Sequence, residues 1–253
     1  MRIIRPDYEI RTKFSDGGIE ELKEIERDAR VCYQSEGDIS EDGESAINLI
    51  RKLIKNGHEA MLEHSKLSVR FTVDRGFSHE LVRHRLCSFA QESTRWCNYS
   101  KDKFGKQLTF VMPTDFNKWF LQNVDLDTYS VFLEELEENA CKAVDHGCEE
   151  DLKFPNGFLK WVYAMYMCED QYMAMLEDGC SPQLARGVLP NSLKTDIVVT
   201  ANFREWRNIF KLRTAKDAHP DMRRIMTQLL KSVSMKIPVV FDDIRSTIDW
   251  NYI

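Results

Sequence analysis

The sequence predicts a single α+β domain spanning residues 1–253, with a mixed or antiparallel sheet flanked by helices. Residues 67–73 alternate apolar and polar side chains, which is typical of a strand with one buried face. From Ala46, apolar residues recur at i, i+3, i+4, i+7 and i+8, the spacing of a helix with one buried side. No linker, repeat or low-complexity tract interrupts the chain, so we expect one domain.

The N-terminal half predicts further elements on either side of these two. Glycine favours helix and strand ends, so Gly57 closes the helix from Ala46 and Gly76 closes the strand. The other expected elements are a short strand within residues 1–14, a charged helix over 19–33, and a short helix over 77–86 that carries Arg83, His84 and Arg85.

The C-terminal half predicts one more strand and then helices. The strand covers residues 108–112 and ends at Pro113. Ser181 and Pro182 offer a capping hydroxyl and a first-turn proline, which favours a helix start there. The other expected elements are a mainly helical stretch over 114–180 that ends at Gly179, a helix from about Thr200 to Leu212, and an amphipathic helix that begins after His219-Pro220.

Composition narrows the functional classes. The formal net charge of −6 argues against a polynucleotide partner, because DNA and RNA binders usually present a basic face. No apolar run approaches the roughly 20 residues that cross a bilayer, and residues 1–14 lack the apolar core of a secretion signal. We therefore expect a cytoplasmic protein that binds neither nucleic acid nor membrane.

The cysteines indicate neither disulfides nor zinc. They number seven, and no pair has the CxxC spacing. We interpret them as reduced thiols that mostly serve as small apolar core residues.

Two partial motifs are rejected, and no metal site is expected. His58-Glu59 and His64 resemble a zinc-protease helix, but that site needs histidines four apart and these are six apart. Residues 38–43 resemble the start of a calcium loop, yet position 12 is Leu49, so we interpret them as a polar turn before a helix. The chain has neither GxGxxG nor GxxxxGK, so any nucleotide must be held by other groups.

A basic cluster stands out in this acidic chain. Arg83, His84, Arg85, Ser93 and Arg95 fall within thirteen positions. Clustered like charges repel, and planar guanidinium groups suit phosphate oxygens, so the cluster favours a small anionic ligand. The alternative is a solvated face with surface ion pairs.

A second cluster follows later in the chain. Arg186 lies close to the start of the helix predicted at Ser181, where N–H groups favour anions. Asn202, Arg204, Asn208 and Arg213 lie along one predicted helix, with Arg204 and Asn208 as neighbours on its surface. An asparagine amide both donates and accepts, which suits the edge of a base, a ribose or an isoalloxazine. Taken alone, this set also fits an exposed polar helix face.

Arg83-His84-Arg85, followed after seven residues by Ser93, resembles the signature of the flavin-dependent thymidylate synthases. The heptapeptide at 58–64 resembles that family's HExxxEH-type element, and residues 185–190 resemble its AR-x-VLP turn. Residues 202–213 resemble its last ligand-binding helix. The matched blocks extend from about residue 29 to 225, and residues 101–180 contribute little.

The resemblance implies a fold of that family's type and a homotetramer with active sites at subunit interfaces. It implies methylation of deoxyuridine monophosphate (dUMP) to thymidine monophosphate (dTMP). Methylenetetrahydrofolate (5,10-methylenetetrahydrofolate) gives the carbon, NADPH is the reductant, and FAD relays hydride and the one-carbon unit. The sequence offers no obvious activated cysteine nucleophile, which agrees with flavin chemistry.

The resemblance also implies site residues by matching position. Arg213 is the expected catalytic residue, whose positive charge polarises the uracil ring and helps to ionise N3 so that C5 becomes nucleophilic. Ser93 is expected to bind and activate, because a nucleophilic serine needs a neighbouring base. The expected dUMP ligands are Glu80, Arg83, Gln91, Glu92, Ser93, Thr94, Arg95, Arg186 and Arg213. The expected FAD ligands are His58, Arg83, His84, Arg85, Gln91, Asn202, Arg204 and Asn208.

Two positions depart from the family pattern, and two other functions remain open. Ala60 and Cys32 stand where family members often carry a small hydroxyl residue, which affects contact details at FAD. One alternative is a nucleotide-binding protein without catalysis, although it would not need Arg213. The other is an RNA-binding module, which the acidic charge and the lack of an aromatic stacking platform disfavour.

Overall fold

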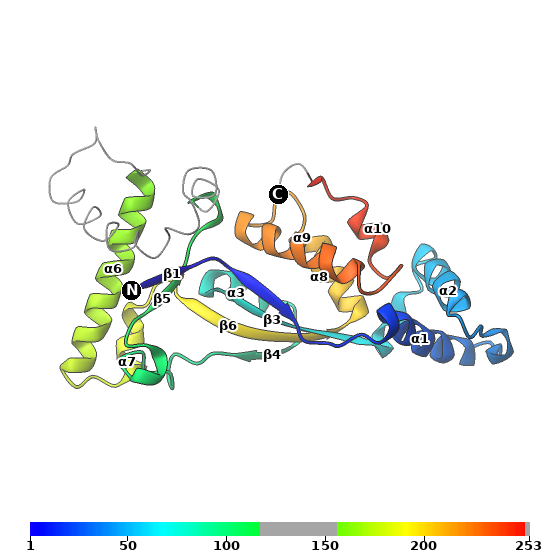
Figure 1. Cartoon of the computed structure of the whole chain (residues 1–253), viewed down its shortest axis with the longest axis horizontal. Helices are drawn as coiled ribbons and strands as arrows, with labels where there is room; N and C mark the ends of the chain where they lie inside the picture. Colours follow the sequence, from blue (N-terminus) through cyan, green and yellow to red (C-terminus); the bar gives the residue numbers. More distant parts are fainter. Residues whose placement is uncertain (117–155, 251–253) are drawn as a thin grey trace. The chain divides into compact units, whose positions relative to one another are not determined.

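The computed structural model describes residues 1–116 and 156–250, and it contains both helices and strands (Figure 1). The predicted α+β class is confirmed. The chain divides into two compact units, and each draws on three separate segments. Unit 1 comprises residues 1–6, 72–80 and 91–196, and unit 2 comprises residues 7–71, 81–90 and 197–253. A single functional domain over 1–253 stays a prediction.

Two nine-residue strands are central to the larger sheet. β3 (Lys66–Asp74) and β6 (Lys194–Asn202) bury every second side chain, as strands with one covered face do. The sheet order is β2-β3-β6-β4, where β2 is Asp7–Ile10 and β4 is Ser88–Gln91. β3 confirms the strand predicted over residues 67–73.

Unit 1 contains a second, two-stranded sheet. β1 (Arg2–Ile4) runs parallel to β5 (Thr109–Val111), with Ile3 opposite Phe110. This pair confirms the strand predicted at 108–112, and β1 and β2 together replace the single strand predicted within residues 1–14. Helices described in this unit include most of α3 (Arg75–Leu81), α6 (Asn156–Glu177), α7 (Pro182–Ala185) and the 3₁₀ turns η4 (Asp102–Phe104) and η6 (Arg186–Val188). Their core is formed by Tyr99, Leu108, Phe110, Met165, Tyr172, Ala185 and Leu193.

Unit 2 holds most of the helices that the structure describes. α1 (Ile19–Val31) packs against α2 (Glu44–Lys55), and α8 (Phe203–Arg213) packs against α9 (Pro220–Ser234), as Figure 1 shows. These four helices confirm the ones predicted near 19–33, 46–54, 200–212 and after 220. Phe203, Phe210 and Phe241 meet edge to face, and the indole N–H of Trp206 donates to the Leu67 carbonyl at 2.8 Å. The remaining short helices are η1 (Asp16–Gly18), η2 (Glu36–Asp38), η3 (Glu59–His64) and α10 (Asp242–Arg245).

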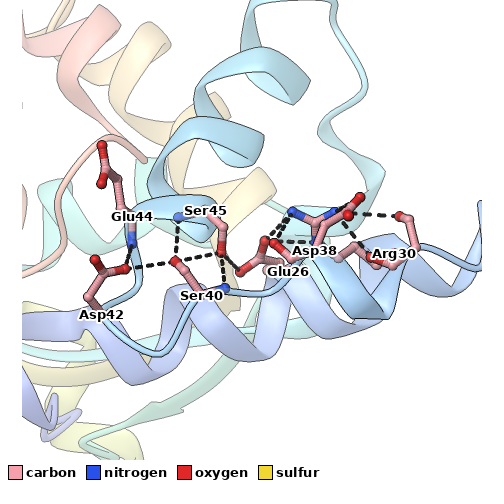
Figure 2. A network of polar contacts seen from close by, with 8 residues as sticks. Glu26, Arg30, Asp38, Ser40, Asp42, Glu44 and Ser45 are labelled. Carbon is pink, nitrogen blue, oxygen red and sulfur yellow. Dashed lines mark hydrogen bonds and ion pairs between the residues drawn. The ribbon is translucent and has the colours of Figure 1, made fainter.

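The stretch that resembles a calcium loop is a polar turn before α2, as predicted (Figure 2). The Asp42 carboxylate accepts the Ser40 hydroxyl at 2.7 Å and the Glu44 amide at 2.9 Å. The Ser45 hydroxyl donates to Glu26, a fully buried carboxylate on α1. These bonds satisfy groups at the helix start and tie α1 to α2.

Two predicted boundaries are wrong. The helix expected over 77–86 is α3, which covers only Arg75–Leu81, so the three signature residues lie in the turn after it. A longer helix would put Arg85 four residues after the buried Leu81, on the same face. The helix expected from Thr200 begins at Phe203, because β6 continues to Asn202.

The prediction over 114–180 is confirmed only in part. α6 is helical, and Gly179 follows it with φ of 87°, a conformation that suits a helix end. Residues 117–155 lie outside the described residues. In the described residues no helix is both long enough and apolar enough to cross a membrane.

The described cysteines form no disulfide bond with one another, and they are not core residues. Cys87, Cys97, Cys168 and Cys180 are half-buried and Cys32 is exposed, while Cys141 and Cys148 lie outside the described residues. The expectation that most of them fill the core is therefore wrong for these five, since larger aliphatic and aromatic side chains occupy that space.

A buried ion cluster ties α8 to two other elements of unit 2. Arg207, 1 % exposed, donates to both carboxylate oxygens of Asp243 on α10, at 2.7 Å each. It also donates to Glu59 on η3 at 3.1 Å and to the Val240 carbonyl at 2.5 Å. Glu59, part of the apparent zinc motif, is thus an ion-pair partner.

Replacing Arg207 with alanine should lower the free energy of unfolding by about 3 kcal/mol, because the half-buried carboxylate of Glu59 loses its shorter ion pair and keeps only the one with Lys211 at 3.5 Å. The measurement is urea unfolding followed by circular dichroism. The matched control is Arg27→Ala, which removes an exposed ion pair with Glu24 on α1 and should change stability by less than about 1 kcal/mol. Equal losses for both variants would contradict a structural role for Arg207.

Candidate functional site

The signature Arg83-His84-Arg85 occupies a turn that points its side chains in different directions. The backbone N–H of His84 donates to the Leu81 carbonyl at 3.2 Å, which closes the turn after α3. His84 is 6 % exposed, whereas Arg83 and Arg85 are exposed. The turn therefore presents two guanidinium groups to solvent and buries the imidazole between them in sequence.

His84 links the acidic side chain of Glu205 to the cationic side chain of Arg213 within unit 2. Its Nε2 lies 3.0 Å from Nε of Arg213, and its Nδ1 lies 3.3 Å from Oε1 of Glu205. An arginine only donates, so Nε2 must accept, and the ring proton must sit on Nδ1, facing the carboxylate. The geometry thus selects one neutral tautomer of His84.

The surroundings of His84 favour this neutral form. Burial lowers the pKa of His84 below its ordinary value of 6.5, and the nearby Arg213 charge lowers it further. Glu205 opposes both effects without outweighing them. His84 is therefore uncharged at neutral pH and can accept the Arg213 hydrogen bond.

Helix α8 and its N-cap carry three further predicted cofactor ligands of unit 2. Asn202 is the N-cap, and its side-chain oxygen accepts the Glu205 amide at 2.8 Å. Asn208 donates to the Glu205 carboxylate at 3.3 and 3.4 Å, while the exposed Arg204 pairs with Glu63 at 2.6 Å. The structure thus joins Asn202, Asn208 and His84 through one residue, and Arg213 joins this group through His84.

That residue, Glu205, is a site residue that the sequence reasoning missed. It is 7 % exposed although it carries a carboxylate. A signal for it existed, because Asn202-x-x-Glu205 has the spacing of a capping box, which places an acidic side chain in the first helical turn. The sequence alone does not show that the same carboxylate meets His84, which precedes it by 121 positions.

In unit 1, Gln91 is held by two buried hydroxyl groups. Its amide nitrogen lies 2.9 Å from the Ser78 hydroxyl and 3.2 Å from the Thr195 hydroxyl, and both of those residues are fully buried. These bonds fix the side chain at the end of β4. The amide oxygen of Gln91 is not used by either bond and can accept from a ligand.

Glu92 is neutralised by its neighbours in unit 1. Its carboxylate accepts from Lys194 at 2.8 Å, from the Tyr99 hydroxyl at 2.9 Å and from the Asp196 amide at 3.2 Å. Burial lowers the pKa of Lys194, but hydrogen bonds to Asp196 and Glu92 outweigh it and raise the pKa above its ordinary value. Lys194 therefore stays charged and offsets the repulsion that Glu92 would exert on an anion.

The segment after Glu92 forms a turn. The Ser93 carbonyl accepts the amides of Trp96 and Cys97 at 3.1 and 2.9 Å, and Thr94 is buried. Arg95 is exposed and donates to Gln183 at 3.0 Å. The Ser93 hydroxyl makes no hydrogen bond within the described residues, so the turn presents it without a protein partner.

Arg186 is not at a helix N-terminus as predicted. α7 is only four residues long, and Arg186 is its C-cap and the first residue of η6. The helix ends this early because Gly187 and the turn to Pro190 follow it directly. The exposed Arg186 side chain makes no ion pair within the part of the chain that the structure describes. The remaining predicted ligands, His58 and Glu80, are exposed and half-buried.

Each unit has a cavity. The one in unit 1 has a volume of about 350 Å³ and is lined by Glu92, Tyr99 and Lys194, so it adjoins a predicted ligand. The one in unit 2 has a volume of about 710 Å³ and includes none of the predicted ligands. Lys211, Lys216 and Arg223 give it cationic walls, and Ile244 and Ile248 give it an apolar one. Asp243 and Asp249 also line the larger cavity and Glu92 lines the smaller, so each cavity carries charges of both signs.

The pKa of His84 has a consequence for stability. Between the lowered pKa of the folded state and about 6.5, the unfolded chain binds a proton that the folded chain does not, so stability falls as pH falls through this window. Urea unfolding of the protein and of His84→Gln, each measured between pH 5 and 7, should show a steeper loss for the unchanged protein. Equal slopes for His84→Gln and the unchanged protein would show that His84 titrates normally.

Comparisons with known proteins show the family of this chain. A sequence profile described as "Thymidylate synthase complementing protein" matches residues 19–239. The chain is 30% identical over 220 residues to a flavin-dependent thymidylate synthase of Geobacter sulfurreducens, covering 85% of this chain and 78% of that one. It is 29% identical over 226 residues to one of Mycobacterium tuberculosis, covering 88% and 79%.

Among solved structures, the UMP/dUMP methylase PolB from Streptomyces cacaoi, bound with 5-Br dUMP, has the same fold. The TM-score is 0.67 with 20% sequence identity, over 98% of each chain. The sequence match over residues 19–239 includes the arginine-histidine-arginine turn and all of α8. The chain belongs to the thymidylate synthase complementing protein family.

Proposed function

We propose that this protein is a flavin-dependent thymidylate synthase, which methylates dUMP to dTMP. The observation that carries the proposal is the family match over residues 19–239, which contains the signature and Arg213. In the proposed reaction 5,10-methylenetetrahydrofolate gives the carbon and NADPH is the reductant, with FAD as the cofactor. The hydrogen bond between the buried His84 and the half-buried Arg213 supports a chemical role for the end of α8 over a merely solvated polar face.

The phosphate of dUMP is proposed to bind in unit 1. Ser93, Thr94, Arg95 and Arg186 supply hydroxyl and guanidinium donors, which suit phosphate oxygens. In support, the Ser93 hydroxyl and the Arg186 guanidinium have no protein partner within the described residues. Glu92, compensated by Lys194, would serve to hold the loop in place.

FAD is proposed to bind in unit 2, and the donors there fit it. Arg83 and Arg85 are exposed and make no ion pair or hydrogen bond through their side chains within the described residues, so both can pair with a pyrophosphate. Arg204 and Asn208 project from one exposed face of α8, and Asn208 offers an amide for a ring edge. When bound, the flavin supplies hydride and one-carbon transfer, and the protein binds and orients.

Arg213 is proposed to act on the uracil ring of dUMP. Its guanidinium remains positive whatever its surroundings, so it can stabilise the negative charge that develops when N3 of the ring loses its proton. The neutral His84 accepts its Nε–H without cancelling that charge. Charge moved into the ring makes C5 the nucleophile.

The cysteines favour this chemistry over a thiolate nucleophile. Burial and the Glu205 charge raise the pKa of Cys87 to about 12, and burial raises the pKa of Cys97 and Cys168 as well. These thiols stay protonated at neutral pH and are weak nucleophiles. A mechanism in which flavin carries the reaction does not need them.

The proposal includes a cytoplasmic homotetramer whose active sites lie at subunit interfaces. Leu86, next to the signature, is 75% exposed, and Trp96, next to Arg95, is 81% exposed. Large apolar side chains exposed beside a ligand site are typical of surfaces that a second subunit covers. One functional domain over residues 1–253 is part of the same proposal.

A spectrum and a turnover assay test the function together. Purified protein, loaded with FAD if necessary, should absorb in the visible range as a flavoprotein does. It should form dTMP only when dUMP, methylenetetrahydrofolate and NADPH are all present. A protein that binds dUMP and FAD but forms no dTMP would be a nucleotide-binding protein without catalysis, and one that takes up no flavin would overturn the proposal.

Replacing Arg213 with alanine should reduce dTMP formation by about 100-fold or more while FAD remains bound, because the charge that stabilises the ring anion is lost. The measurement is turnover per bound flavin. Arg51→Ala, an exposed arginine on α2, is the control and should leave turnover unchanged. Unaltered turnover in Arg213→Ala would remove the proposed role.

A further inference from the structure

We propose that Glu205 is the positioning residue for Arg213 and that it acts through the imidazole of His84. This inference rests on the proposed function, since the role of Arg213 belongs to it. Glu205, His84 and Arg213 form a continuous series of contacts, at 3.3 Å from carboxylate to Nδ1 and at 3.0 Å from Nε2 to the guanidinium Nε.

The direction of the hydrogen bonds explains why the acid is needed. A neutral imidazole carries its proton on either nitrogen, and only the Nδ1–H form leaves a lone pair on Nε2. A carboxylate at Nδ1 accepts that proton's hydrogen bond and so selects this form. With the proton on Nε2, two N–H groups would face each other across 3.0 Å, and the Arg213 contact would be lost.

The bond at Nε also determines what Arg213 can do. Nε lies at the base of the guanidinium fork, so a bond there fixes the plane of the group and does not itself use the two terminal amino groups. Those terminal groups are the ones suited to a planar ligand edge. Glu205 thus sets the plane of the Arg213 guanidinium indirectly, through the one intervening side chain of His84.

Glu205 is itself rigidly held. Its backbone amide bonds to the Asn202 cap, and its carboxylate accepts from Asn208 at 3.3 and 3.4 Å. The side chain is nearly inaccessible to solvent, and burying a carboxylate costs free energy that an apolar residue would not. Burial and the Glu205 charge raise the pKa of Cys87. Its thiol therefore stays protonated and adds no second negative charge beside Glu205 and His84.

A double-mutant cycle in the FAD-loaded enzyme tests the coupling. The variants are Glu205→Ala, Arg213→Ala and the two combined, and the measurements are dUMP affinity by calorimetry, kcat and bound flavin. Glu205→Ala should lower kcat by about 100-fold, as misplacement of a catalytic group does. When Glu205→Ala is added to Arg213→Ala, dUMP binding should be no weaker than in Arg213→Ala alone. Equal weakening in both backgrounds would overturn the proposal.

Two further variants separate positioning from general damage. Glu205→Gln keeps an acceptor for Nδ1–H, so it should retain most of the activity that Glu205→Ala loses. A Gln variant as impaired as the Ala variant would mean that Glu205 acts by its charge, which overturns a role through the ring. Glu26→Gln is the matched control, because Glu26 is also buried in unit 2 but bonds to Arg30 and Ser45 (Figure 2). It should leave kcat unchanged.

The tautomer of His84 gives a readout that does not depend on activity. Nitrogen NMR of the protein labelled at histidine, assigned with His84→Gln, should show Nδ1 protonated and Nε2 unprotonated. Glu205→Ala should shift the proton toward Nε2, and an unchanged tautomer would overturn the inference. Should the chain bind no dUMP, the proposed function fails, while this measurement still decides whether Glu205 orients His84.

Discussion

The buried ion cluster around Arg207 is the constraint on which helix α8 depends. Its guanidinium meets Asp243 on α10 through two bonds and Glu59 on η3 through a third. A buried arginine tolerates little displacement, because water cannot solvate its charge if the ion pairs are broken. The cluster therefore fixes the rotation of α8 about its axis, which also fixes where Glu205 and Asn208 point.

Much of this could be predicted from the sequence, where period and spacing carry the information. The alternation in β3 and the helical period of α2 predict both elements because each has one buried face. The signature at Arg83-His84-Arg85 and the position of Arg213 indicate a nucleotide site, since few folds gather such charges without an anion. The family assignment follows from those same residues.

Other features depend on contacts between distant positions. α3 ends at Leu81 because only one of its faces is buried, and the sequence alone does not show what packs against that face. β6 was missed because the polar Thr195 lies on its buried side and the apolar Val198 on the other, which breaks the alternation of a half-buried strand. The role of Glu205 was missed for the same reason: a cap at Asn202 is a local pattern, whereas the contact with His84 exists only after folding.

Unit 2 combines segments that are far apart in the chain, which affects how it folds during translation. The Leu67 carbonyl can accept its hydrogen bond only after the indole of Trp206, 139 residues downstream, has been synthesised. At bacterial or eukaryotic translation speeds of about 5–20 residues per second, that delay is roughly 7 to 28 seconds. For that time the apolar side of β3 emerges uncovered, so the nascent chain is a natural client for chaperones that shield such stretches until synthesis reaches α8.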